Sequence, residues 1–124
     1  MTTLVEKSKT LDEGIKNIIS SAIEDFTRWS TDADGTISSY SQDRIDAGLG
    51  FKVNDGSKYI KLTNELGNGQ TCVWGFVVKS DNDKKFRQGD VLLAAGFNKP
   101  ARNKARGNIF DGNFKVTWSQ PLYL

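Results

Sequence analysis

The residues best suited to chemistry lie at positions 99–106, where the chain reads Lys-Pro-Ala-Arg-Asn-Lys-Ala-Arg. This segment holds four cations and no acid, and apolar, aromatic-rich segments with β-like alternation flank it. Arginine and lysine bind phosphate oxygens, and aromatic rings stack on unpaired bases. The segment therefore predicts a nucleic-acid interface in which phosphates contact Lys99, Arg102, Lys104 and Arg106. The alternative is a cationic surface that does no more than keep the protein solvated.

The local sequence also predicts how this segment folds. Pro100 favours the first position of a short helix, and Gly107 favours its end. On such a helix Arg102 and Arg106 would lie about one turn apart, each able to fork onto a phosphate. In the alternative, the segment is a connector whose arginines pair with acids of the amino-terminal part.

Two aromatic residues are candidates for stacking on bases. Tyr59 lies between Lys58 and Lys61, and Trp118 lies three residues after Lys115. Base–aromatic stacking contributes about 1–3 kcal/mol per base. The other aromatic residues of the β-like segments alternate in phase with apolar neighbours, which favours a place in the core.

Charge is unevenly distributed along the 124 residues, whose formal net charge is +2. Residues 1–51 carry five Lys/Arg and nine Asp/Glu, whereas residues 52–124 carry twelve Lys/Arg and six Asp/Glu. This asymmetry favours a polyanionic partner for the carboxyl-terminal part. The acidic part could instead mask the basic part within one molecule.

Other chemistry has little basis in this sequence. The chain has no histidine, which removes the commonest general base and most zinc sites. Cys72, the single cysteine, falls in an apolar strand-like segment, where we expect a buried and unreactive thiol. The Asp-Ala-Asp-Gly-Thr run at 32–36 is similar to a calcium loop, but Ile37 occupies the position that needs glycine. We expect a plain turn there, no metal or other cofactor, and a non-enzymatic protein.

The spacing of apolar residues predicts an α+β fold in one domain, 1–124. Apolar residues from Leu11 to Trp29 recur every 3–4 residues, and Thr10 with Glu13 has the capping-box pattern. We predict a loose segment over 1–9, an amphipathic helix over 10–30, a loop-rich connector over 31–50 and a β-rich part over 51–124. The helix is followed by an antiparallel sheet of about five strands that curls into a small barrel.

Within the β-rich part, the segments 51–53 and 59–62 flank an Asn-Asp-Gly-Ser turn typical of a hairpin. The segment 71–79 is apolar on both faces, which predicts a central strand. Strict alternation would place Cys72, Trp74, Phe76 and Val78 on one of its faces. The segments 91–97 and 114–118 are each predicted to form a further strand.

Part of the chain resembles a viral family. The stretch from Asp90 to Ala101, continued by Ala-Arg-Gly-Asn-Ile-Phe-Asp at 105–111, resembles small uncharacterised proteins of tailed bacteriophages, cyanophages first among them. Those proteins share a strand that ends in an aromatic residue, a Lys-x-Pro-Ala turn and Ala-Arg-Gly-Asn-Ile. The resemblance covers residues 73–111. It departs from the pattern at Phe97, followed here by Asn98, where the family usually has tryptophan before the turn. The resemblance implies a viral origin and no mechanism.

These observations favour a non-enzymatic nucleic-acid-binding accessory protein that binds single strands without regard to sequence. A protein-interaction or assembly module is the alternative, in which the apolar helix stripe or an open sheet edge joins copies into a homo-oligomer. The lone cysteine, and the lack of any leader-like or membrane-spanning apolar run, favour the cytoplasm, that of the host cell if the protein is viral.

Overall fold

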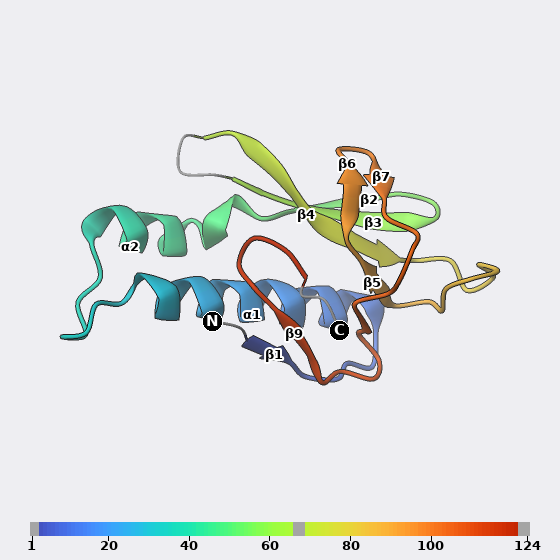
Figure 1. Cartoon of the computed structure of the whole chain (residues 1–124), viewed down its shortest axis with the longest axis horizontal. Coiled ribbons are helices and arrows are strands. Elements are labelled where there is room, and N and C mark those ends of the chain that lie inside the picture. The colour runs from blue at the N-terminus through green and yellow to red at the C-terminus, as the bar shows by residue number, and fades with distance from the viewer. Residues whose placement is uncertain (1–2, 66–68, 122–124) are drawn as a thin grey trace.

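The computed structural model describes residues 3–65 and 69–121 and has an α+β architecture (Figure 1). Its elements, in chain order, are β1 (Thr3–Val5), α1 (Leu11–Ser30), α2 (Ser39–Asp46), the 3-10 turn η1 (Gly48–Gly50), β2 (Lys52–Asp55), β3 (Tyr59–Glu65), β4 (Thr71–Val78), β5 (Asp90–Leu92), β6 (Ala94–Gly96), β7 (Lys99–Pro100), β8 (Gly107–Asn108) and β9 (Phe114–Val116). None of the described helices has the length and apolar character that crossing a bilayer requires.

Helix α1 begins where its capping residues place it. The Thr10 hydroxyl accepts a hydrogen bond of 3.1 Å from the backbone N–H of Glu13, and two acids occupy the positive end of the helix. The buried positions Ile15, Ile18, Ala22 and Phe26 recur every three to four residues. Trp29, which the sequence places on the same stripe, is 61% exposed.

The predicted five-stranded antiparallel sheet is confirmed, with the order β2-β3-β4-β5-β8. The β2–β3 hairpin forms as its turn residues indicate, and β4 is central. The predicted barrel is wrong, because β2 and β8 remain edges of an open sheet among the described strands. Two short sheets, β1–β9 and β6–β7, complete the architecture, and the β6–β7 hairpin stands on the opposite side of the main sheet from α1 (Figure 1).

The sheet separates two apolar clusters. The larger, toward α1, contains Ile18, Leu62, Trp74 and Val77, and the smaller contains Phe76 with three other buried residues. Strict alternation predicted that Trp74 and Phe76 share a face, and this is wrong. A register shift between Leu62 and Thr63, opposite residues 73–75, inserts an extra residue into β4 and moves Trp74 to the α1 side.

Five further expectations need correction. Residues 3–5 of the supposedly loose start form β1, paired with β9, and the 31–50 connector contains α2. The expected strand over 91–97 is divided into β5 and β6, which belong to different sheets, and the expected strand over 114–118 ends at Val116. Cys72 is half-buried rather than buried, because β5 pairs with β4 only at Phe76 and Val77.

Candidate nucleic-acid interface

The cationic segment 99–106 is extended, not helical. Lys99 and Pro100 form β7, and residues 101–106 follow as an irregular connection to β8. The connection is attached at both ends, since Ala101 donates its backbone N–H to the Leu93 carbonyl (2.7 Å) and Arg106 donates to the Val91 carbonyl (2.7 Å). The expected row of Arg102 and Arg106 on one helical face therefore does not exist.

The end of the predicted motif, Arg106, belongs to the core together with the residues that follow it. Arg106 is 1% exposed, so its side chain is out of reach of a phosphate on the surface, contrary to its predicted role. A Cβ at Gly107 would lie 2.4 Å from Phe114, so only glycine fits there. The buried Asn108 amide donates to the Gln88 carbonyl (3.0 Å) and to Asp90 (2.9 Å).

Arg102, by contrast, extends to a different loop. Its guanidinium donates to both carboxylate oxygens of Asp83 (2.9 and 3.0 Å) and to the Tyr59 hydroxyl. Its Cζ also lies 4.9 Å from the centroid of the Phe86 ring, a cation–π contact. The structure thus brings together Arg102 and Tyr59, two of the predicted site residues, although 43 positions separate them.

Asp83 is fixed by several donors at once. Besides Arg102, its Oδ1 accepts the backbone N–H groups of Lys85 (2.8 Å) and Phe86 (3.0 Å). These hydrogen bonds, that from Arg102 first, hold the pKa of the Asp83 carboxyl well below its usual range. The same pair raises the pKa of Arg102. The side chain of Asp83 is 13% exposed and that of Arg102 is 41% exposed, so the arginine remains accessible from solvent.

Arg102 and Tyr59 border a hollow of about 430 Å³ between the β2–β3 hairpin and the loop after β4. We call it the Arg102 hollow. Its lining consists of three cations, one acid and three uncharged polar side chains: Lys58, Lys84, Arg102, Asp83, Tyr59, Ser80 and Asn82. Lys58 and Lys84 form no ion pair with any described residue, so their charges are available to a ligand.

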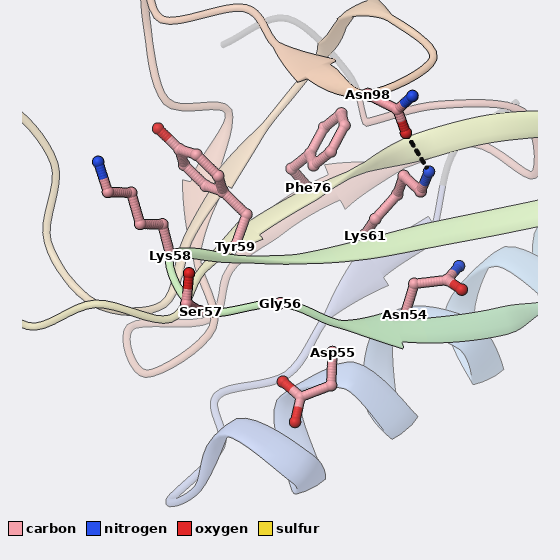
Figure 2. Close-up of a pocket in the computed structure, with 9 residues that line it drawn as sticks. All are labelled: Asn54, Asp55, Gly56, Ser57, Lys58, Tyr59, Lys61, Phe76 and Asn98. Carbon is pink, nitrogen blue, oxygen red and sulfur yellow. Dashed lines mark hydrogen bonds between the residues drawn. The ribbon is translucent and has the colours of Figure 1, made fainter.

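A second hollow, of about 520 Å³, shares Lys58 and Tyr59 with the first. We call it the Phe76 hollow. Figure 2 shows the side chains of Tyr59 and Lys61 on the same side of β3, with Phe76 behind them and Asn98 above. The Tyr59 and Phe76 rings meet edge to face, with centroids 6.2 Å apart, and Lys61 Nζ donates to Asn98 Oδ1 (2.8 Å).

The two hollows together carry a positive balance. Lys58, Lys61, Lys84 and Arg102 stand against two acids in their linings. One of those acids, Asp55, is paired with Lys79 at 2.8 Å. The electrostatic character of this surface therefore favours an anionic ligand.

The remaining predicted site residues lie elsewhere. Lys99 and Lys104 are exposed, but among the described residues neither lines the two hollows. Trp118 is half-buried and packs edge to face on Phe26 (5.4 Å between centroids), with its other ring neighbour at Trp29. In the part of the chain that the structure describes, it lines neither hollow and does not join the candidate site.

Sequence reasoning missed one exposed aromatic residue beside the Phe76 hollow. Phe97, in the turn between β6 and β7, is 55% exposed, and Lys61 Nζ lies 4.2 Å from its ring centroid. The sequence shows it as the last residue of an apolar run, which favours the core. The signal that could have identified it is the Gly-Phe-Asn order of a tight turn.

Comparison with known proteins gives no match: no family model, curated protein or solved structure is similar to this chain. Nor do three His, Cys, Asp or Glu side chains of the described residues gather where they could hold a metal ion. The geometry of the two hollows is therefore the basis for assigning a function.

Proposed function

We propose that this protein binds single-stranded nucleic acid, without sequence preference, along the two hollows that meet at Tyr59. The observation that carries the proposal is the convergence of Lys58, Lys84 and Arg102 around that ring. They come from the β2–β3 turn, the loop after β4 and the connection after β7. A cationic groove with an aromatic platform is the arrangement that binds single strands through phosphates and base faces.

The positions of the cations favour single strands over duplex. They lie on hairpins and loops rather than along a helix of the kind that enters a major groove. The half-buried Tyr59 ring is set within a hollow, where an unpaired base can reach it and a stacked base pair cannot, and Phe76, 3% exposed, lies behind it. Because lysine and arginine contact the backbone, binding at this surface is expected to depend little on sequence.

The same proposal includes a biological setting, an accessory protein of a phage that acts in the cytoplasm of the host cell. Its support is the resemblance to tailed-phage proteins. In its Ala-Arg-Gly-Asn-Ile portion, Arg106, Asn108 and Ile109 are buried and Gly107 and Asn108 form β8. This portion therefore stabilises the fold and does not bind the ligand. Of the four cations that line the two hollows, Lys84 and Arg102 lie within residues 73–111, which the resemblance covers, and Lys58 and Lys61 lie outside that range.

A salt titration of a fluorescent single strand tests the proposal. If Lys58, Lys61 and Lys84 neutralise about three phosphates, while Asp83 balances the charge of Arg102, log affinity should fall with log salt with a slope of about −2. The double variant Lys58→Gln/Lys84→Gln should make this slope shallower by about 1.4 and weaken binding by about 25-fold at 0.1 M salt.

The matched control is Lys16→Gln/Lys115→Gln, which removes the same charge from exposed positions on α1 and β9. Its affinity should stay within about three-fold of the wild type, because charges beyond one Debye length are largely screened. Equal losses in the two double variants would show that only net charge matters. A wild-type protein that fails to bind any strand at low salt would overturn the proposal.

Of the two surfaces considered for assembly, the helix stripe and a sheet edge, the structure leaves only the sheet edge exposed. Ile15 and Ile18 of the helix stripe are 5% and 0% exposed, so that stripe packs on the sheet and is not available to a second copy. The β2 edge is different, because all four of its residues are exposed and Val53 is 49% exposed. Light scattering of the wild type and of Val53→Lys tests association through this edge. If the molar mass of the variant in solution is not lower than that of the wild type, association through the β2 edge is ruled out.

A further inference from the structure

We propose that the two hollows form one composite site for a single nucleoside phosphate unit, with the base in the Phe76 hollow and the phosphate in the Arg102 hollow. This inference rests on the proposed function and specifies its ligand. Its starting point is that the hollows share Lys58 and Tyr59, so they adjoin at these two side chains and a ligand that extends past them contacts both. Each volume, about 520 and 430 Å³, is within the range of small-ligand clefts.

The Phe76 hollow has the chemistry of a base-binding site. It is lined by the half-buried ring of Tyr59, by the small exposed part of Phe76, whose side chain is 3% exposed, and by the amides of Asn54 and Asn98. Rings offer a flat apolar surface to a base, and amides offer both a donor and an acceptor to its edge. Figure 2 shows the Asp55 carboxylate pointing away from the Tyr59 and Phe76 rings, so its charge is directed outside this space.

The Arg102 hollow has the chemistry of a phosphate-binding site. Lys58, Lys84 and Arg102 line it, whereas the apolar contribution is limited to Tyr59. The guanidinium of Arg102 is engaged by Asp83 but is 41% exposed, so a phosphate can take one of its N–H donors from the solvent side. The Tyr59 hydroxyl accepts from Arg102, which fixes the ring at the border between the two hollows.

The order of the two chemistries along one groove matches the order within a nucleotide. A phosphate held by Lys84 and Arg102 leaves its base on the side of Tyr59 that faces Phe76. A base can occupy that position only when it is unpaired and unstacked. The composite site therefore accounts for the preference for single strands that the proposed function assigns.

Backbone-amide NMR titrations with adenosine 5′-monophosphate, adenosine and inorganic phosphate test this inference. The monophosphate should shift the amides of both hollows, adenosine those around Phe76 and Asn98, and phosphate those around Lys84 and Arg102. We expect the monophosphate to bind at least about five-fold more tightly than adenosine, because its phosphate adds charge-assisted hydrogen bonds that adenosine cannot form.

Variants separate the two halves of the site. Lys84→Gln should remove the advantage of the monophosphate and leave adenosine binding unchanged, and Lys115→Gln, on β9, should change neither. Tyr59→Leu should weaken both ligands. A monophosphate that binds no more tightly than adenosine, or that shifts amides away from the two hollows, overturns the inference.

A parallel titration with a short oligodeoxyadenylate distinguishes this failure from failure of the proposed function. Strand binding that depends on Lys58 and Lys84, without mononucleotide binding across both hollows, overturns the composite site alone. Mononucleotide binding at both hollows without strand binding supports the site and overturns the nucleic-acid function, with a free nucleotide as the ligand. The absence of both overturns both.

Discussion

Asp83 should act as a competitor of the nucleic acid for Arg102, and Asp83→Asn should therefore bind a single strand more tightly than the wild type. The carboxylate receives two hydrogen bonds from the guanidinium, at 2.9 and 3.0 Å, in the wall of the Arg102 hollow. A phosphate that reaches this hollow meets an arginine whose charge is already balanced. Asparagine has nearly the same shape but no charge, so it releases the arginine without emptying the space.

The size of the expected gain in affinity follows from one additional cation at the site. Each phosphate neutralised on a single strand contributes about 0.7 to the slope of log affinity against log salt. At 0.1 M salt, one decade below the 1 M reference, this corresponds to about five-fold in affinity. We therefore expect Asp83→Asn to bind about five-fold more tightly, with a slope steeper by about 0.7, in a fluorescence anisotropy titration.

The loop that holds Arg102 should survive the substitution. The asparagine side chain of the variant retains a carbonyl oxygen for the backbone N–H groups of Lys85 and Phe86, which Asp83 Oδ1 accepts at 2.8 and 3.0 Å. The matched control is Asp81→Asn, which removes the same charge from an exposed neighbour outside both hollows. Equal affinities of the two variants, or a weaker Asp83→Asn, would refute the idea of competition.

Three further predictions concern stability. Gly107→Ala should lower the free energy of unfolding by about 1–3 kcal/mol in urea denaturation, because the new methyl group meets Phe114 at 2.4 Å. The control Gly96→Ala should leave the free energy of unfolding nearly unchanged, because a Cβ there meets nothing within 4 Å. Ile18→Asp should lower the free energy of unfolding by about 3–5 kcal/mol in thermal melts, because a charge enters a position that is 0% exposed. The control Ser20→Asp, at an exposed position of the same helix, should change it little. The depressed pKa of Asp83 predicts that its contribution to stability is present in full above about pH 4 and is lost as pH falls through the lower folded value. Any stability difference between wild type and Asp83→Asn should then narrow only in acid below about pH 4, and a narrowing between about pH 7 and 5 would contradict this assignment.

Local patterns in the sequence predicted the elements whose causes are local. The capping of α1 by Thr10 and the 3.6-residue spacing after it are contained in one segment, and so is the turn that closes the β2–β3 hairpin. The faces of β4 were not predictable in the same way. They depend on a register shift against β3, and nothing in the alternation around Trp74 indicates where an extra residue enters.

The exposure of the arginines in the cationic segment 99–106 was likewise not predictable from the local sequence. Arginine is rarely buried without a specific environment, so a sequence alone favours exposure for Arg102 and Arg106 equally. Their positions differ because of residues distant in the chain: Asp83 and Tyr59 receive Arg102, whereas the strand pairing of β5 with β8 draws Arg106 inward. Tyr59 lies on a cationic surface because Lys84 and Arg102, which are distant in the sequence, join Lys58 around it, and its role in binding stays a prediction.

The two anchored ends of segment 99–106 determine the position of its exposed middle. Hydrogen bonds from Ala101 to Leu93 and from Arg106 to Val91 fix both ends of the connection, and these anchors determine where Arg102 can reach. A substitution at the buried Arg106 would therefore disturb folding and the position of Arg102 at once, and a loss of binding in it would say nothing about phosphate contact. Lys58 and Lys84 lie on other segments and form no ion pair among the described residues, so only changes at such positions separate the electrostatics of the site from the stability of the fold.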